Sequence, residues 1–132
     1  MNELTSEWVE KAESDFYSTE LLLRAGEFPV PDSACFHSQQ CAEKYLKAFL
    51  QEHMVRFERT HKLTMLLDLC LPLDQEFERI RGALEKLENY SVAVRYPGVR
   101  ISVEIADEAF ALTGKIRALV RTKLKLFLHT GD

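Results

Sequence analysis

Apolar residues recur at helical spacing along most of the chain, and the longest uninterrupted pattern lies between Asp32 and His53. No glycine or proline breaks this stretch, and Asp32 or Ser33, just after a proline, could cap its first turn. Its apolar positions form one wide face: Ala34, Cys35, Cys41, Ala42, Tyr45, Leu46, Phe49 and Leu50. The pattern predicts a central helix whose early small residues would let another helix approach closely.

A polar stripe runs along the same predicted helix. His37, Gln40, Lys44 and Lys47 are spaced by three or four residues and therefore share one side. A histidine, an amide and two lysines offer the groups that bind a phosphate and a base, so this edge is a candidate nucleotide site. A solvated helix edge or a dimer contact is the alternative interpretation. Glu43 is expected to balance charge there.

Apolar stripes of the same kind predict four further helices. Their expected caps and ends are Thr5 or Ser6 to Gly26, Thr60 to Pro72, Asp74 to about Tyr90, and Ser102 to about Phe127. The chain has no period-two strand pattern, repeat or low-complexity segment. The sequence therefore predicts one all-α domain over residues 1–132, built as an antiparallel helical bundle.

The one long irregular segment is 91–100, where Pro97 and Gly98 favour a type II turn. Functional residues are over-represented in such loops. Arg95 could bind a phosphate there, and Tyr96 could stack on a base or donate through its hydroxyl. The structural alternative is that Arg95 pairs inside the bundle with an acidic residue: Glu13, Asp15 or Glu43.

Composition narrows the class of protein. At 132 residues the chain can bury a core without disulfides or metals, and its net charge of -4 argues against general coating of nucleic acid while allowing a local basic pocket. Three cysteines without a signal-peptide pattern indicate reduced thiols, and no apolar run is long enough to span a membrane. We expect a cytoplasmic protein with no membrane contact.

Candidate catalytic and metal-binding residues are few. His61 at a predicted helix start could act as a general base near neutral pH, with Arg56 holding a scissile phosphate; a hydrogen bond to a neighbouring group is the alternative role. Cys35, His37 and Cys41 do not supply the four ligands of a closed zinc site, and only the last two share a face. The sequence predicts no metal and no cofactor, with the cysteines as small core residues.

Four motifs occur in order along the chain, and the second is the most specific. They are Trp8 with Lys11-Ala12-Glu13-x-Asp15, Phe36-His37-x-Gln39-Gln40-x-Ala42-Glu43-Lys44-x-Leu46-Lys47-Ala48, Thr60-His61-x-Leu63, and Ala93-Val94-Arg95-Tyr96-Pro97. Together they resemble the HEPN domain family, which is named for nucleotide binding in higher eukaryotes and prokaryotes. The resemblance implies an up-and-down four-helix bundle with an additional short helix, and a homodimer.

The resemblance also implies a biological setting. Small stand-alone members are encoded beside a minimal nucleotidyltransferase and form a toxin–antitoxin-like pair with it. Active members are metal-independent RNases whose signature is an arginine and a following histidine with four to six residues between them. No histidine follows Arg95 within reach, and the only pair with that spacing is Arg56 and His61.

Together with these residues, the resemblance implies a nucleotide- or RNA-binding helical module that is the partner of a nucleotidyltransferase and lacks the standard RNase motif. The expected binding residues are His37, Gln40, Lys44, Lys47, Arg95 and Tyr96. An active metal-independent RNase toxin using Arg56 and His61 is one alternative. A structural interaction module with no small ligand is the other.

Overall fold

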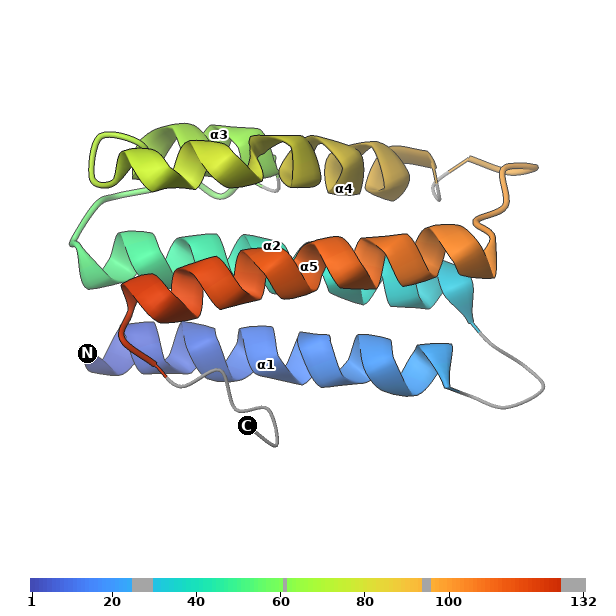
Figure 1. Cartoon of the computed structure of the whole chain (residues 1–132), viewed down its shortest axis with the longest axis horizontal. Helices are drawn as coiled ribbons and strands as arrows, with labels where there is room; N and C mark the ends of the chain where they lie inside the picture. Colours follow the sequence, from blue (N-terminus) through green and yellow to red (C-terminus); the bar gives the residue numbers. More distant parts are fainter. Residues whose placement is uncertain (25–29, 61, 94–95, 127–132) are drawn as a thin grey trace.

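The described part of the chain, residues 1–24, 30–60, 62–93 and 96–126 of a computed structural model, is entirely helical apart from its connections. Its elements are α1 (Glu3–Leu23), α2 (Pro31–Glu52), α3 (Leu63–Cys70), the 3₁₀-helix η1 (Gln75–Ile80), α4 (Arg81–Ala93) and α5 (Val103–Lys123). The predicted all-α fold is confirmed. Successive long helices α1, α2, α4 and α5 alternate in direction, and α3 is the additional short helix (Figure 1).

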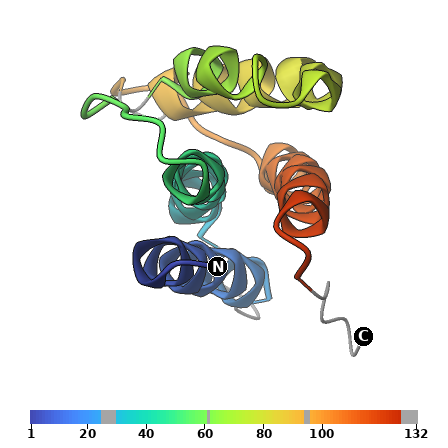
Figure 2. The same cartoon turned by 90° about the vertical axis from the view of Figure 1, so that its left-hand side faces the viewer.

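Helix α2 is the centre of the bundle. Figure 2 shows α1 on one side of it, α3 and α4 on the opposite side, and α5 flanking it. More than half of the 22 residues of α2 are buried, and the buried set includes polar residues as well as apolar ones. Because α2 is enclosed by the other helices, its buried polar side chains need partners inside the protein, and among the described residues only Ser38 Oγ lacks one.

The core consists of large side chains from the middle helix and small ones where helices approach closely. Tyr45, Leu46 and Leu50 are fully buried, and Ala12 and Ala42 have no exposed surface. Each buried leucine-sized side chain stabilises the fold by about 1.5–3 kcal/mol. The predicted wide apolar face of the central helix is therefore confirmed as the main contributor to the core.

Two of the expected helix caps are confirmed. Ser102 accepts a hydrogen bond from the backbone N–H of Ile105, as an N-cap should. Asp74 accepts from the backbone N–H of Glu76, although the element it caps is η1, which leads directly into α4. An N-cap residue can thus be identified from the sequence even where the first turns form a 3₁₀-helix instead of an α-helix.

The other expected caps are wrong. Helix α1 begins after Asn2, whose side chain accepts from the Thr5 N–H, so Thr5 and Ser6 already lie inside the helix. Helix α2 begins at Pro31 without a side-chain cap. For α3 the N-cap position is Lys62, and the hydroxyl of Thr60 instead accepts from the Lys62 N–H in the preceding turn. Gly26 and Phe127 lie outside the described residues.

Two helices end in the same way, without a glycine. Beyond α2, the N–H of Val55 bonds to the carbonyl of Leu50, and the left-handed residue between them is Met54, with φ of 58°. Beyond α5, the Leu126 N–H bonds to the Arg121 carbonyl around Lys125, with φ of 61°. These are Schellman motifs, which usually place glycine at that position. The last helix therefore ends at Lys123, earlier than its stripe predicts.

The predicted type II turn is confirmed at 96–99. The Val99 N–H donates to the carbonyl of Tyr96, and Gly98 has the positive φ of 86° that the third position of this turn requires. The turn keeps Tyr96 at the surface. None of the helices in the described residues is long and apolar enough to cross a membrane.

Replacing Met54 by glycine should raise the free energy of unfolding by about 0.5–1 kcal/mol, because a left-handed residue with a Cβ is strained while Met54 itself is exposed. Urea unfolding followed by circular dichroism measures the change. Gln51→Gly, three residues earlier and inside the helix, is the matched control and should lose about 1 kcal/mol. Destabilisation by Met54→Gly would contradict this account of the helix end.

Candidate functional site

The polar edge of α2 meets a buried carboxylate of α1. Asp15 Oδ1 lies 2.7 Å from His37 Nδ1, and Asp15 Oδ2 lies 2.5 Å from Lys44 Nζ. These two residues of the predicted stripe are thus brought together by an acidic residue from a different helix. We refer to Asp15, His37 and Lys44 as the edge cluster.

The edge cluster has a buried anion and two partly exposed donors. The Asp15 side chain is 10% exposed, whereas His37 is 31% and Lys44 22% exposed. An ionised carboxylate can only accept, so His37 Nδ1 carries the proton and Nε2 remains available for another partner. The ammonium of Lys44 likewise has donors beyond the one that Asp15 receives. Asp15 therefore holds the His37 and Lys44 side chains in place from inside the bundle, and their remaining polar atoms can bind an anion at the surface.

The rest of the polar stripe is engaged in side-chain contacts. Gln40 Nε2 donates to Gln39 Oε1 over 2.9 Å, so its own amide oxygen stays available. Lys47 is buried, forms an ion pair with Glu43 over 3.0 Å, and lies over the rings of Trp8 and Phe57. The expectation that Glu43 balances charge agrees with this contact. Lys47 therefore lies beneath the edge rather than on it.

A second carboxylate of α1 ties three helices together on the side facing α5. Arg117 donates to both oxygens of Glu13, each over 2.8 Å, and the hydroxyl of Tyr45 donates to Glu13 Oε2. Arg121 Nη1 donates to that hydroxyl over 3.1 Å and lies 3.5 Å from Glu13 Oε1. Arg117 also stacks over the ring of Phe16. We refer to Glu13, Tyr45, Arg117 and Arg121 as the core ion network.

The electrostatics of the core ion network favour the charged form of Glu13. Burial by itself raises the pKa of this carboxyl, but hydrogen bonds from Arg117 and Tyr45, and the charges of Arg117 and Arg121, outweigh it and lower the pKa below its ordinary value. The same environment raises the pKa of Tyr45 far above its ordinary value, chiefly through burial and then through Glu13. Tyr45 is therefore a neutral hydrogen-bond donor.

The remaining predicted site residues are placed separately. Arg56 lines a surface hollow of about 330 Å³ beyond the C-terminal end of α2, whereas His37 is near the N-terminal end of the same helix. His37 and Arg56 are nineteen positions apart in the chain, which separates these two side chains along the bundle. Tyr96 is exposed in the turn that follows α4. His61 and Arg95 lie outside the described residues.

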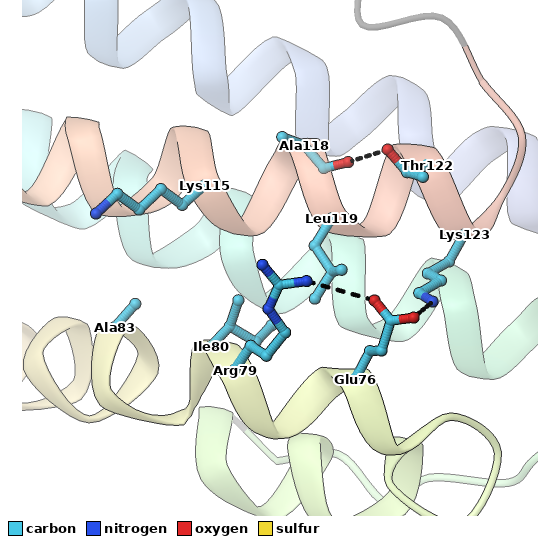
Figure 3. Close-up of a pocket in the computed structure, with 9 residues that line it drawn as sticks. All are labelled: Glu76, Arg79, Ile80, Ala83, Lys115, Ala118, Leu119, Thr122 and Lys123. Carbon is cyan, nitrogen blue, oxygen red and sulfur yellow. Dashed lines mark hydrogen bonds and ion pairs between the residues drawn. The ribbon is translucent and has the colours of Figure 1, made fainter.

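A larger hollow lies between α5 and the η1–α4 segment, and no sequence motif indicated it. It measures about 560 Å³. Figure 3 shows Ile80, Ala83 and Leu119 along it, with charged side chains around them. We refer to it as the α4–α5 groove. It lies where the η1–α4 segment meets α5, and both α4 and α5 pack on α2.

The cysteines and acidic residues offer little metal chemistry. All three cysteines are buried and free. Burial raises the pKa of Cys35 to about 11 and that of Cys70 to about 12, so both are neutral thiols at physiological pH. Among the described residues, no group of three or more histidine, cysteine and acidic side chains is arranged to hold a metal ion.

The core ion network was not foreseen from the sequence. Arg117 and Arg121 are four residues apart on the last helix and therefore share one side, which faces inward although it is charged. The available signal was this pair of arginines interrupting an apolar stripe. As an ion-pair partner, the sequence suggests Glu13 only for Arg95.

Comparison with known proteins agrees with the fold and the motifs. The family described as HEPN domain matches residues 5–123. The chain therefore belongs to the HEPN domain family. No curated protein sequence matches it significantly.

Two solved structures are similar over nearly the whole chain. The archaeal HEPN homologue ST0689 is 26% identical, with a TM-score of 0.71, and the match covers 91% of this chain and 97% of that one. TT1696 from Thermus thermophilus is 27% identical, with a TM-score of 0.71, and the match covers 90% and 97% of the two chains. Both have the same fold as this protein.

Replacing Glu13 by glutamine should lower the free energy of unfolding at pH 7 by about 3 kcal/mol, because Arg117 and Arg121 lose the carboxylate they share. Since the pKa of Glu13 is lowered on folding, its contribution is present above the ordinary carboxyl pKa of 4.5 and is lost as the pH falls through the lower, folded value. Urea unfolding at neutral pH and near pH 3 measures both effects.

Glu10→Gln is the matched control for this substitution, because Glu10 is an exposed glutamate of the same helix. It should change stability by less than about 0.5 kcal/mol. The difference between wild type and Glu13→Gln should shrink toward pH 3. A difference of equal size at both pH values would show that the charge of Glu13 is not what stabilises the bundle.

Proposed function

We propose that this HEPN protein binds RNA or nucleotides at the edge cluster, with His37 and Lys44 contacting phosphate. The observation that carries the proposal is the pairing of both side chains with the buried carboxylate of Asp15, 2.7 Å and 2.5 Å away, while each stays partly exposed. Side chains fixed in this way lose little conformational freedom when a ligand arrives, which favours binding.

The charges of the edge cluster suit a phosphate. Lys44 supplies a permanent cation, and Asp15 holds it on the same edge as the His37 ring, whose Nε2 is the ring nitrogen left for a phosphate contact. The ring of Phe36 lies 5.3 Å from the His37 ring and offers an apolar surface beside the phosphate position.

Other residues of the predicted set have supporting parts in the proposal. Gln40, one turn along α2, offers an amide oxygen to a base or sugar. Lys47 holds Glu43 in place beneath the edge. Tyr96 is exposed and available to stack on a base. Arg95 is included in the proposal from the sequence analysis alone, because it lies outside the described residues.

We further propose that the protein acts as a homodimer through one end of the bundle. Exposed apolar side chains occur at the end of the bundle where α1 and α4 end and α2 begins: Leu21, Phe36, Val92, Tyr96 and Val99. Figure 1 shows these element ends at the same end of the bundle, with α1 and α4 on opposite sides of α2. Large exposed apolar patches are typical of interaction sites, and a dimer through this end would bring two edge clusters near each other.

The setting that the family suggests is a pair with a minimal nucleotidyltransferase. In this proposal the HEPN protein supplies the RNA- or nucleotide-binding half of a toxin–antitoxin-like pair, with a nucleotidyltransferase encoded beside it as the partner. Copurification of the two coexpressed proteins, compared between wild type and the edge-cluster variants, tests that pairing directly.

Binding of a fluorescein-labelled single-stranded RNA, followed by fluorescence anisotropy at low salt, tests the site. His37→Ala and Lys44→Gln should each raise the dissociation constant about tenfold, since each removes one charge-assisted hydrogen bond to phosphate. The affinity of the wild-type protein should fall as salt is added, because phosphate contacts release counterions.

Lys86→Gln is the matched control, because Lys86 is an exposed lysine of α4 paired with Glu108. It should leave RNA affinity within about twofold of wild type. Equal affinity for wild type and both edge-cluster variants, with unchanged melting temperatures, would exclude this site. RNA cleavage without added metal that Arg56→Ala abolishes would instead support the RNase alternative.

The dimer proposal has its own prediction. Phe36→Asp should reduce the molar mass measured by light scattering from twice 15.3 kDa to 15.3 kDa, because a charge replaces an apolar contact. Met65→Asp, on α3, is the control, since Met65 is equally exposed but lies away from that end of the bundle. A wild-type monomer would contradict the proposal at once.

A further inference from the structure

The geometry points to a second binding site in the α4–α5 groove, for a small organic anion that carries an apolar body. This site goes beyond the proposed function and is independent of it: the edge cluster lies between α1 and α2, whereas the groove lies between α5 and the η1–α4 segment (Figure 2). Nothing in the edge cluster contributes to the lining of the groove.

The size of the groove suits a small molecule. Its volume of about 560 Å³ falls within the range of roughly 300–1,000 Å³ that ligand pockets occupy. The groove extends along α5 from Lys115 to Lys123, which is about 12 Å at the helical rise per residue. That length is two turns of helix, too short to seat a stable partner helix but enough for a fused ring or a short chain.

The lining has an apolar floor. Ile80 lies near Leu119, and Ala83 continues the apolar lining along α4 toward Lys115 (Figure 3). The small side chains of Ala83 and Ala118 leave space in the groove that larger side chains at these positions would fill. An apolar ligand body placed here removes the surfaces of these residues from water, which favours binding by about 25 cal/mol for each square ångström buried.

The charged rim of the groove is asymmetric. At one end the ammonium of Lys123 is neutralised by Asp74 at 2.8 Å and Glu76 at 3.1 Å. Toward the other end Arg79 has only a long contact with Glu76, at 3.5 Å. Lys115 has no ion pair with any residue of the described chain. The surplus positive charge therefore lies at the end of the groove where Lys115 and Arg79 are.

This asymmetry sets the orientation and the class of the ligand. The anionic group, a carboxylate, sulfonate or phosphate, lies between the side chains of Arg79 and Lys115, and the apolar body lies over the floor toward Leu119. Figure 3 shows the Arg79 guanidinium near α5 beside Leu119 and the Lys115 ammonium farther along the rim, so the expected place of the anion is the rim between them. A neutral ligand of the same shape lacks that attraction.

The probe for the test is 1-anilinonaphthalene-8-sulfonate, an aromatic monoanion whose fluorescence rises in apolar surroundings. Titration of the full-length protein should show saturable binding. Arg79→Ala and Lys115→Ala should each weaken binding about threefold, and the double variant about tenfold, since exposed charge contacts are individually modest. The uncharged N-phenyl-1-naphthylamine should bind more weakly than the sulfonate and should be insensitive to these substitutions.

Two further variants keep the test decisive. Ala83→Leu fills the floor without changing charge and should also reduce sulfonate binding, while Lys86→Ala, an exposed lysine of α4 outside the groove, should not. Octanoate and adenosine 5′-monophosphate serve as competitors. Whichever of them displaces the sulfonate shows whether an aliphatic acid or a nucleotide is the natural ligand of the groove. Sulfonate binding that is unchanged in the double variant, or unchanged in Ala83→Leu, would overturn the proposal.

His37→Ala separates this inference from the proposed function. It should leave sulfonate binding unchanged because His37 is not part of the groove. Two independent sites would be established if His37→Ala lost RNA binding and kept sulfonate binding, while the Arg79 and Lys115 variants lost sulfonate binding and kept RNA binding. Loss of sulfonate binding in His37→Ala would contradict the groove as the binding place.

Discussion

The enclosure of α2 is the constraint on which the rest of the structure depends. A central helix covered by four others must satisfy its polar side chains inside the protein, and α1 supplies two carboxylates for this purpose. Glu13 receives Arg117 and the Tyr45 hydroxyl on the side of α5, and Asp15 receives side chains on the other side. The positions of α1 and α5 are therefore fixed by ion pairs as well as by apolar packing.

The two carboxylates serve different purposes because their surroundings differ. The core ion network is closed: the arginine side chains are buried and bind Glu13 from two turns of α5, which suits a structural role. The edge cluster is open, with partly exposed His37 and Lys44 above a buried Asp15. In this account the family motif on α2 serves both the bundle and the proposed site. Each turn of α2 carries one residue that packs in the core and one residue that lies on the polar edge.

The sequence was most informative where residues close together in the chain determine the local structure. The central helix, the cap at Ser102 and the turn at Gly98 were all predicted, because spacing, a capping side chain and a Pro-Gly pair act locally. Partners were harder to predict. Asp15 as the shared partner of the polar stripe, and Arg117 as an inward-facing charge, depend on how helices distant in sequence meet. The α4–α5 groove likewise lies between segments that meet only in the folded chain, which no local pattern records.

The central claim, that the edge cluster receives phosphate, is tested most directly by nitrogen-15 NMR of the histidine and lysine side chains during titration with a short single-stranded RNA. The account predicts that the signals of His37 Nε2 and Lys44 Nζ shift together and saturate with the binding curve, while that of Lys86 Nζ does not move. RNA binding that shifts other side chains and leaves His37 and Lys44 unchanged would contradict it.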